Sequence, residues 1–398
     1  MTSTAQTTAS NIPTPVPAAR FAKARSKEEF VASIKREDLV YFLLNVGDGD
    51  SQLLLLPARE RDDTRRAIVV DVATTEKLPA LLDALAGTRL LPGHPDDGYL
   101  FPLVVATHPH DDHIGGMPEF LASPWGRSVR ELWEPGYYHP SRAYLGMMRV
   151  LEDADPHIQH TQPTSGTTRF IGRLKVQVLV PSIGLRTRFD TYGVDLNDAS
   201  IALRLEFPAS RVEERPDGRR YVRPNSRTLI LGADSLLASW AQVLVDFPEM
   251  HPEKTPTAKL LRKAIGRDAL RAEIFKIPHH ASKHGVTLGL VEVVQPSVSL
   301  ISSVAGGGKY NFPHAVALEA IREALEATTL TGAPRSEDYL LGIHHTSARD
   351  SKGAALGSIA VVVGPQGRRR DIWRFGDSPS ELVDLDKARR FLPPRSSR

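Results

Sequence analysis

A short apolar run that leads directly into a cluster of histidines constrains this chain more than any other feature. Leu103-Val104-Val105-Ala106 is followed by Thr107-His108-Pro109-His110-Asp111-Asp112-His113-Ile114-Gly115-Gly116. His108 and His110 are two residues apart, so in extended backbone their side chains point to the same side. Asp112 and His113 follow where the chain turns towards a helix, where they can face a second centre. A polar loop with surface histidines rarely has this spacing, so the sequence predicts a metal site.

The ligands of such a site must be nitrogen and oxygen atoms. The 398 residues include no cysteine, which excludes thiolate metal sites, iron–sulfur clusters and disulfides. Imidazole and carboxylate groups hold zinc, manganese or iron without sulfur. The absence of cysteine also fits a reducing compartment, and we expect a cytoplasmic protein.

Composition indicates a globular protein and gives little support for a strongly basic nucleic-acid binder. Hydrophobic residues make up 41% and charged residues 24% of the chain, and the formal net charge is only +3. No apolar run approaches the roughly 18 residues of a membrane span, so we expect no membrane partner. Residues 1–37 begin with a stretch rich in Thr, Ala, Ser and Pro, which predicts a disordered leader. We expect residues 379–398 to form a C-terminal tail.

Residues 38–378 read as one domain in which short strands alternate with helices. Strands are predicted at 39–44, 53–56, 67–70, 103–106, 174–180, 201–207, 228–231, 274–277, 298–302 and 359–363. Helices are predicted after 75 and from 115, and at 236–245, 258–270 and 315–327. Two stretches resemble insertions, a charged hairpin or loop near 208–227 and a polar helical segment near 246–271. Mixed strands and helices predict sheets with helices on their outer faces.

Further polar residues stand at the ends of predicted strands. Asp71 and Asp234 each follow an apolar strand, and His279 and His280 follow a strand and Pro278. Strand ends are usual positions for functional groups in layered α/β folds. The residues alone leave open that Asp234 is a solvated aspartate and that the two histidines lie on the surface.

The cluster at 108–113 resembles the HxHxDH signature of the metallo-β-lactamase superfamily, and further motifs resemble the hydrolase domain of ComEC-type DNA-uptake proteins. These motifs are Asn45-Val46-Gly47-Asp48-Gly49-Asp50-Ser51, Val70-Asp71, Asn197-Asp198-Ala199-Ser200, Gly232-Ala233-Asp234, Lys276-Ile277-Pro278-His279-His280-Ala281-Ser282-Lys283 and Tyr310-Asn311-Phe312-Pro313-His314. Their order matches the family over roughly residues 39–365. The chain departs from the subfamily where Ala281 replaces a glycine and where Ala233 precedes Asp234.

The resemblance implies an αββα sandwich, with two mixed sheets face to face, helices outside and the metal site at one edge. It implies two divalent metal ions, zinc or manganese, with Asp234 bridging them. The implied ligands are His108, His110, Asp112, His113, Asp234 and His280. Asp71 would orient the metal loop without binding metal.

Members of the family use a further histidine between the cluster and the bridging aspartate. His139, His157 and His160 are the candidates here, and His139 is preferred because it follows the apolar strand Glu131-Leu132-Trp133. None of the three lies in a motif of its own.

The resemblance further implies a hydrolase that uses a metal-bound hydroxide, most closely a phosphodiesterase or nuclease. Asp112 would serve the hydrolytic centre, His279 would contact the substrate oxyanion, and Lys283 would offer a charge to a phosphate. The substrate would be a phosphodiester, either a small molecule or a nucleic acid. A hydrolase of a lactam, lactone or thioester and a non-catalytic regulatory module of the same fold are the alternatives. The basic run Arg368-Arg369-Arg370 lies far from these motifs in sequence, which disfavours a strict requirement for long DNA.

Overall fold

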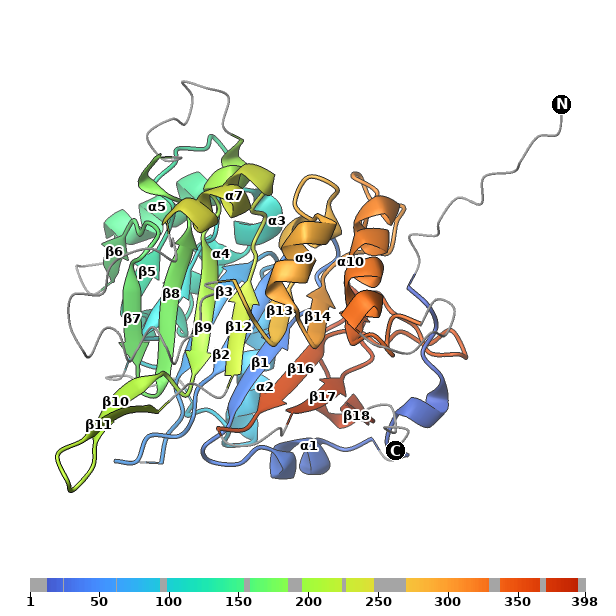
Figure 1. Ribbon diagram of the computed structural model, residues 1–398, viewed down its shortest axis with the longest axis horizontal. Helices are drawn as coiled ribbons and strands as arrows, with labels where there is room; N and C mark the ends of the chain where they lie inside the picture. Colours follow the sequence, from blue (N-terminus) through green and yellow to red (C-terminus); the bar gives the residue numbers. More distant parts are fainter. Residues whose placement is uncertain are drawn as a thin grey trace, which may run out of the picture.

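Two β-sheets packed face to face form the centre of the protein (Figure 1). The computed structural model describes residues 13–23, 25–61, 63–93, 99–153, 158–184, 195–223, 227–246, 270–328, 337–365 and 370–392. Among these residues, no helix combines the length and the apolar character needed to cross a bilayer.

The first sheet has nine strands in the order β18-β17-β16-β1-β2-β3-β4-β5-β6. Strands β3 to β6 pair in parallel and the others pair antiparallel. The bounds are β1 Leu39–Leu43, β2 Ser51–Leu55, β3 Ala67–Val72, β4 Leu103–Val105, β5 Glu131–Trp133, β6 Gln159–Thr161, β16 Ile359–Val363, β17 Arg370–Arg374 and β18 Arg389–Phe391.

The second sheet has seven strands in the order β15-β14-β13-β12-β9-β8-β7, of which β12 to β15 pair in parallel. The bounds are β7 Thr168–Ile171, β8 Leu174–Val180, β9 Ala202–Phe207, β12 Arg227–Leu231, β13 Ile274–Lys276, β14 Val298–Ile301 and β15 Ile343–His345. A separate antiparallel hairpin joins β10 Arg211–Glu214 to β11 Arg220–Arg223, within the stretch near 208–227 for which the sequence predicts a charged hairpin or loop.

Helices cover the outer face of each sheet. Their bounds are α1 Lys27–Ser33, α2 Lys77–Gly87, α3 Asp111–Ile114, α4 Met117–Ala122, α5 Arg142–Asp153, α7 Leu237–Asp246, α9 Leu288–Val294 and α10 Ala315–Thr328. In Figure 1, α9 and α10 lie in front of the second sheet, and the first sheet lies behind it. All ten predicted strands are present, with bounds that differ by at most two residues. The predicted helix at 258–270 lies almost entirely outside the described residues, as does most of the insertion expected at 246–271.

The alternation of side chains along the strands explains this layering. Within β1, Tyr41 faces the cluster between the two sheets, whereas Val40 and Phe42 face a cluster shared with α2, α4 and α5. In β12, Leu229 faces the central cluster and Ile230 faces a third one shared with α7, α9 and α10. Successive side chains in a strand point to opposite faces, so a strand covered on both faces is apolar throughout. The predicted αββα sandwich is thereby confirmed.

Parts of the two terminal segments fold onto the domain, contrary to expectation. Within the segment predicted to be a disordered leader, α1 begins at Lys27, directly after Ser26, whose side chain caps the helix, and it buries Phe30 completely. Phe30 packs edge-on against Trp373 and Phe375. At the other end, β18 pairs with β17 and buries Phe391 within the predicted tail. The prediction rested on the overall polarity of these segments, but each carries several apolar side chains that become buried, among them Phe21 in the first and Leu385 in the second.

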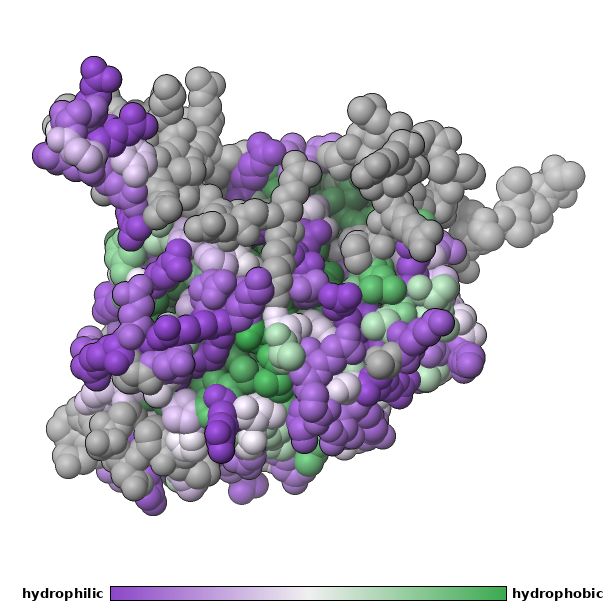
Figure 2. Space-filling view, turned by 90° about the horizontal axis from the view of Figure 1, so that it is seen from below, coloured by the Kyte–Doolittle hydropathy of each residue, from purple (hydrophilic) through white to green (hydrophobic). Residues whose placement is uncertain are grey.

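Polar and apolar side chains share the end of the molecule that lies opposite the histidine cluster. Figure 2 shows this end, where hydrophilic residues surround hydrophobic patches.

A buried ion pair lies inside the fold. Lys77 Nζ is 2.8 Å from Asp377 Oδ2, and both side chains are almost fully buried. Asp377 also accepts hydrogen bonds from the backbone and side chain of Ser358.

We expect Lys77→Met to lower the free energy of unfolding by about 3–5 kcal/mol, because it leaves the buried Asp377 charge without a partner. The matched control is Lys27→Met, since Lys27 pairs with Asp386 at 3.6 Å on the surface. That change should cost less than about 1 kcal/mol. Urea unfolding of both variants measures the difference, and equal costs would contradict the stabilising role of the buried pair.

A second prediction concerns pH and rests on His344 in β15. Burial, together with the charges of Arg374 and Arg370, lowers the pKa of His344 to about 3. The unfolded chain takes up a proton at this histidine below about pH 6.5, whereas the folded protein does so only near pH 3. The free energy of unfolding therefore falls as the pH falls through this window. Between pH 7.5 and 5 the loss from this group is about 2 kcal/mol.

The variant His344→Asn isolates this effect, because every other histidine is common to both proteins. The difference in unfolding free energy between wild type and variant should change by about 2 kcal/mol between the two pH values, in favour of the variant at pH 5. A constant difference would show that His344 titrates normally in the folded state.

Candidate metal centre

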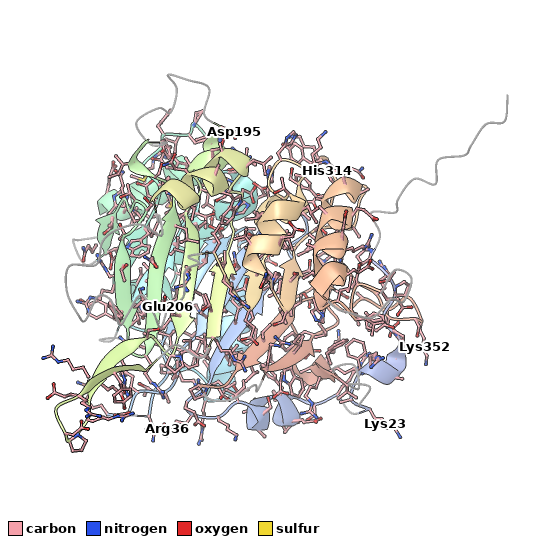
Figure 3. All side chains as sticks on the ribbon, in the orientation of Figure 1. Lys23, Arg36, Asp195, Glu206, His314 and Lys352 are labelled. Carbon is pink, nitrogen blue, oxygen red and sulfur yellow. The ribbon has the colours of Figure 1, made fainter. Side chains whose placement is uncertain are left out.

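The carboxyl ends of strands from both sheets meet at one edge of the sandwich. Chain segments that follow β4, β12, β13 and β14 lie there, at the edge where Figure 3 labels His314. Ligand sites in α/β folds commonly lie at the carboxyl ends of parallel strands. This edge brings together histidines and aspartates that are distant in sequence.

Asp234 is the centre of this cluster. Its carboxylate oxygens lie 3.2 Å from His113 Nε2, 3.5 Å from His280 Nε2 and 3.7 Å from His108 Nε2. His108 Nε2 lies 3.1 Å from His110 Nδ1, and His280 Nε2 lies 4.0 Å from Asp112 Oδ2. All six residues predicted as ligands therefore meet at one point, with His108, His113, Asp234 and His280 buried.

Several ligand-type atoms at this point are buried without a hydrogen-bond partner. They are His113 Nε2, His280 Nε2 and Asp234 Oδ1. Leaving such atoms unsatisfied is costly, and three of them converging on one point fits a bound cation. The residues form two adjoining groups whose ligand atoms lie within 4.8 Å of one another: Asp112, His113, Asp234 and His280, and His108, His110 and Asp112. Nitrogen and oxygen donors in this number fit two divalent metal ions.

Asp71 fixes the orientation of His113. Its Oδ2 lies 2.8 Å from His113 Nδ1, and it also accepts hydrogen bonds from the backbone and hydroxyl of Thr107. A proton held at Nδ1 leaves Nε2 free as a ligand. Burial alone would lower the pKa of His113, but the carboxylates of Asp234 and Asp71 outweigh it and raise the pKa well above its usual value.

His280 is oriented from the second sheet. Its Nδ1 lies 3.0 Å from the carbonyl oxygen of Ser302, and the Ser302 hydroxyl donates to Asp50 Oδ1 at 2.5 Å. Asp50 forms an ion pair with Lys276, and both side chains are fully buried. Burial would raise the pKa of Asp50, but the charges of Lys276, His280 and His113 together outweigh it and lower the pKa.

Left-handed backbone aims the double histidine at the centre. His279, His280 and Ala281 have φ values of 47°, 52° and 62°, in the region that favours glycine. Such residues cost of order 1 kcal/mol or more each and persist only where the surroundings hold them. His279 N donates to the carbonyl of Ala233 at 2.8 Å, and His314 N donates to the carbonyl of Ala281 at 3.0 Å. Ala281, which stands where the resembling subfamily has glycine, therefore occupies a glycine-like conformation.

The turn before β2 packs against the metal loop. Asp50 N donates to the carbonyl of Asp112 at 3.1 Å. A Cβ atom at Gly49 would lie 2.4 Å from the same oxygen, so any side chain there would displace the loop. This contact holds the segment with Asp112 in place and explains why glycine occupies position 49.

The three candidates for a further histidine differ in their surroundings. The His139 ring lies 5.4 Å from the His110 ring, at the rim of the second group. His160 Nε2 lies 3.0 Å from Glu134 Oε1, in a separate polar contact. His157 lies outside the described residues. His139 therefore stays the preferred candidate.

Of the two predicted substrate-contacting residues, His279 lies beside the centre, and Lys283 follows it on the same segment. His279 Nε2 is 3.6 Å from Asp234 Oδ2, and its side chain is 16% exposed. Burial lowers the pKa of His279 to about 4, so its ring is neutral at neutral pH. Lys283 is exposed, and its backbone N–H donates to His314 Nδ1 at 3.0 Å.

Sequence reasoning did not assign roles to Asp50, Lys276 and Ser302, which support the centre from behind. Asp50 and Lys276 lie inside motifs that carry the resemblance. The signal that could have been used is Lys276, a lysine between the apolar residues Phe275 and Ile277, which calls for a buried partner. Ser302 follows an apolar strand without any local motif, and its role depends on tertiary structure alone.

Comparisons with known proteins give only distant matches. No family model and no curated protein matches the chain. Among solved structures, the metallo-β-lactamase fold protein YhfI from Bacillus subtilis is 12% identical, with 78% of this chain and 98% of that one covered and a TM-score of 0.37.

Two further solved structures are similar at the same level. A diphosphatase of the PhnP family is 11% identical, with 79% and 95% covered and a TM-score of 0.35. CmlA, a diiron β-hydroxylase from Streptomyces venezuelae, is 13% identical with a TM-score of 0.33, and 74% of this chain and 52% of CmlA are covered. At such scores, the assignment of the site rests on its own geometry.

We expect Asp71→Asn to weaken metal binding by about 10- to 100-fold while leaving the fold intact, because it removes the carboxylate that orients His113. Zinc titration against a chelating dye measures the affinity, and the wild type should bind close to two equivalents. The matched control is Glu131→Gln, a buried carboxylate that bonds to Trp133 and Arg169 away from the centre. Equal affinity in wild type and Asp71→Asn would exclude the orienting role.

Proposed function

We propose that this chain is a metal-dependent hydrolase whose substrate is a phosphodiester. The convergence of unpaired His113, His280 and Asp234 atoms at a solvent-accessible edge supports the proposal most directly. Two divalent ions bound there would activate water at neutral pH and polarise the substrate oxygen. The side chains around them would bind and orient the substrate.

His279 is placed to act on the substrate side. Its ring is neutral at neutral pH, and its Nε2 points towards Asp234 at the open mouth of the centre. A neutral imidazole there can donate one N–H to an oxygen on which negative charge develops. The left-handed turn at 279–281 fixes the direction of that donor.

Positive charge at the mouth supports a phosphodiester over an uncharged substrate. Lys309 is exposed on the loop that follows β14, and its ammonium lies 4.7 Å from the centroid of the Tyr310 ring. Lys283 lies three residues after His280 and is also exposed. These cations can hold a phosphate oxygen.

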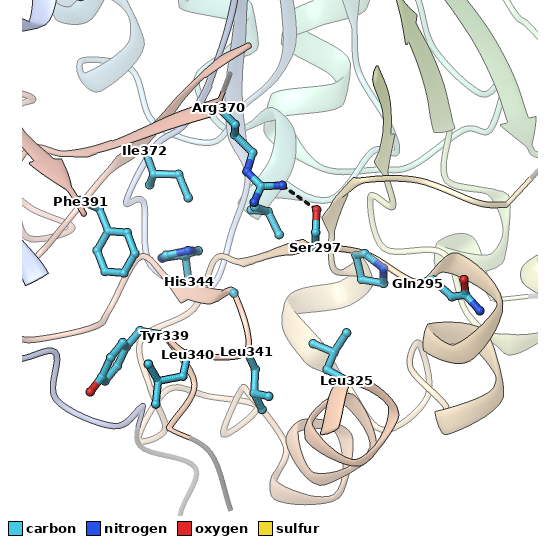
Figure 4. A pocket seen from close by; sticks show the side chains of 13 residues that line it. Gln295, Ser297, Leu325, Tyr339, Leu340, Leu341, His344, Arg370, Ile372 and Phe391 are labelled. Atoms are coloured by element: carbon cyan, nitrogen blue, oxygen red, sulfur yellow. Dashed lines mark hydrogen bonds between the residues drawn. The ribbon is translucent and has the colours of Figure 1, made fainter. Parts of the chain in front are cut away.

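A lactam, lactone or thioester would favour a closed apolar pocket beside the metals. An apolar cavity of about 430 Å³ is present, lined by Leu325, Leu341, Ile372 and Phe391 with Arg370 and His344 (Figure 4). It opens at the amino end of β14, beside Ser297, whereas the metal centre lies beyond the carboxyl end of the same strand. This cavity does not serve the metal centre, so it lends the alternative no support.

The test is turnover of bis(p-nitrophenyl) phosphate, a lactam and DNA by the zinc- or manganese-loaded protein. Asp112→Asn and Asp234→Asn should each reduce phosphodiester turnover by several orders of magnitude, because each removes a charged ligand from the centre. The control is Asp217→Asn in the exposed β10–β11 turn, which should leave turnover unchanged.

Metal analysis of the same samples separates loss of metal from loss of chemistry. Turnover within a few-fold of wild type in either centre variant would exclude the proposed role of that residue. Faster turnover of the lactam than of either phosphodiester would contradict the proposed substrate.

A further inference from the structure

A short loop after β14 projects beside the metal centre and is tightly held. Val304 N donates to Asp48 Oδ1 at 2.9 Å at the start of the loop. Gly306 N donates to the carbonyl of Phe312 at 2.6 Å, which closes the base of the loop. The hydrogen bond from His314 N to Ala281 anchors its exit to the double-histidine turn. The tip of the loop, residues 307–311, is therefore presented from a fixed base.

An aromatic pair leads from the two adjacent histidines, His279 and His280, to solvent along this loop. The Phe312 ring is buried and lies 5.1 Å from the ring of His279 and 5.6 Å from that of His280. The Tyr310 ring lies 5.7 Å from Phe312 at an interplanar angle of 31°, and 53% of Tyr310 is exposed. The exposed Tyr310 is thus separated from the predicted metal ligand His280 only by the ring of Phe312.

Lys309 completes the tip of the loop. Its ammonium lies 4.7 Å from the centroid of the Tyr310 ring. The side chain is fully exposed and long enough to move between this ring and a neighbouring anion. A planar apolar surface and a cation therefore stand together at the mouth of a centre proposed to bind phosphodiesters.

We propose that Tyr310 stacks on the base of a nucleotide phosphodiester while Lys309 contacts its phosphate. This inference rests on the proposed function and narrows its substrate class to nucleotides. Exposed aromatic side chains bind bases by stacking with little dependence on sequence. A quaternary ammonium such as choline also binds aromatic faces, but here it would meet the like charge of Lys309. A neutral base joined to an anionic phosphate matches both groups.

Binding of thymidine 5′-monophosphate, measured by calorimetry on the zinc-loaded protein, tests the inference without any turnover. Tyr310→Ala should weaken binding by about tenfold or more, and Tyr310→Phe should restore it, because the ring is what stacks. The matched control is Tyr99→Ala, since Tyr99 is exposed to a similar extent, 51%, and packs beside Arg130. Unchanged binding in Tyr310→Ala would overturn the inference.

Two substrates with the same leaving group test the role in turnover. We expect Tyr310→Ala to raise KM for thymidine 5′-(p-nitrophenyl phosphate) about tenfold with little change in kcat, and to leave methyl p-nitrophenyl phosphate unaffected. Lys309→Gln should raise KM for both, because both carry the phosphate. Equal effects of Tyr310→Ala on the two substrates, or no effect of Lys309→Gln on either, would contradict the assigned roles.

The two proposals fail in different ways. Absence of turnover of both esters by the wild type would refute the phosphodiesterase, and weaker nucleotide binding by Tyr310→Ala would still support the stacking role. Conversely, active enzyme with a Tyr310-independent KM for the thymidine ester would refute stacking alone. A requirement for Tyr310 with p-nitrophenyl phosphorylcholine but not with the thymidine ester would overturn the assignment to nucleotides.

Discussion

The buried ion pair between Asp50 and Lys276 joins the two sheets directly behind the metal centre. Asp50 precedes β2 in the first sheet, and Lys276 ends β13 in the second. A fully buried pair is tolerated only when its charges and lone pairs are well matched, and Asp50 also accepts from Ser302, which orients His280. The relative position of the two sheets, and with it the distance between the two halves of the ligand set, depends on this contact.

Each half of the centre comes from a different sheet. His108, His110, Asp112 and His113 follow β4, whereas Asp234 and His280 follow β12 and β13. Because the ligands come from both sheets, bound metal cross-links them and stabilises the folded state. This stabilisation grows with the ratio of the free metal concentration to the dissociation constant. The fold already holds the buried carboxylates and imidazoles close together before metal binds. It also keeps residues 279–281 in a strained left-handed conformation.

The sequence predicted those parts of the protein in which chemistry and spacing are local. The apolar runs at β1, β4, β13 and β16 identified their strands, and the spacing of His108, His110, Asp112 and His113 identified the metal loop. Asp234 and His280 were assigned by resemblance, and the structure brings them to the same point. The position of His139 beside His110 agrees with the preference among the three candidates, although metal binding by His139 stays a prediction.

Other features depend on contacts between distant residues and left no pattern in the sequence. Strands β6 and β17 are short and carry polar or charged residues, so their pairing is decided by the neighbouring strand and not by periodicity. Phe30 packs within a segment that its composition assigned to disorder, and Phe391 packs within the predicted C-terminal tail. The positions of the Phe312 and Tyr310 rings beside the centre depend on a loop whose shape is set by hydrogen bonds to Asp48 and Ala281.

The pairing of β1 with β16 has a consequence for how the protein is made. Leu39 pairs with Val363, so one side of β1 stays without its neighbour until residue 363 has left the ribosome. Until then, β1 offers five apolar residues and unpaired backbone groups, the features that lead edge strands to associate with other chains. Contacts between such distant residues also slow folding. Protection of β1 during synthesis, by a chaperone or by temporary pairing within the chain, would lower this risk of association.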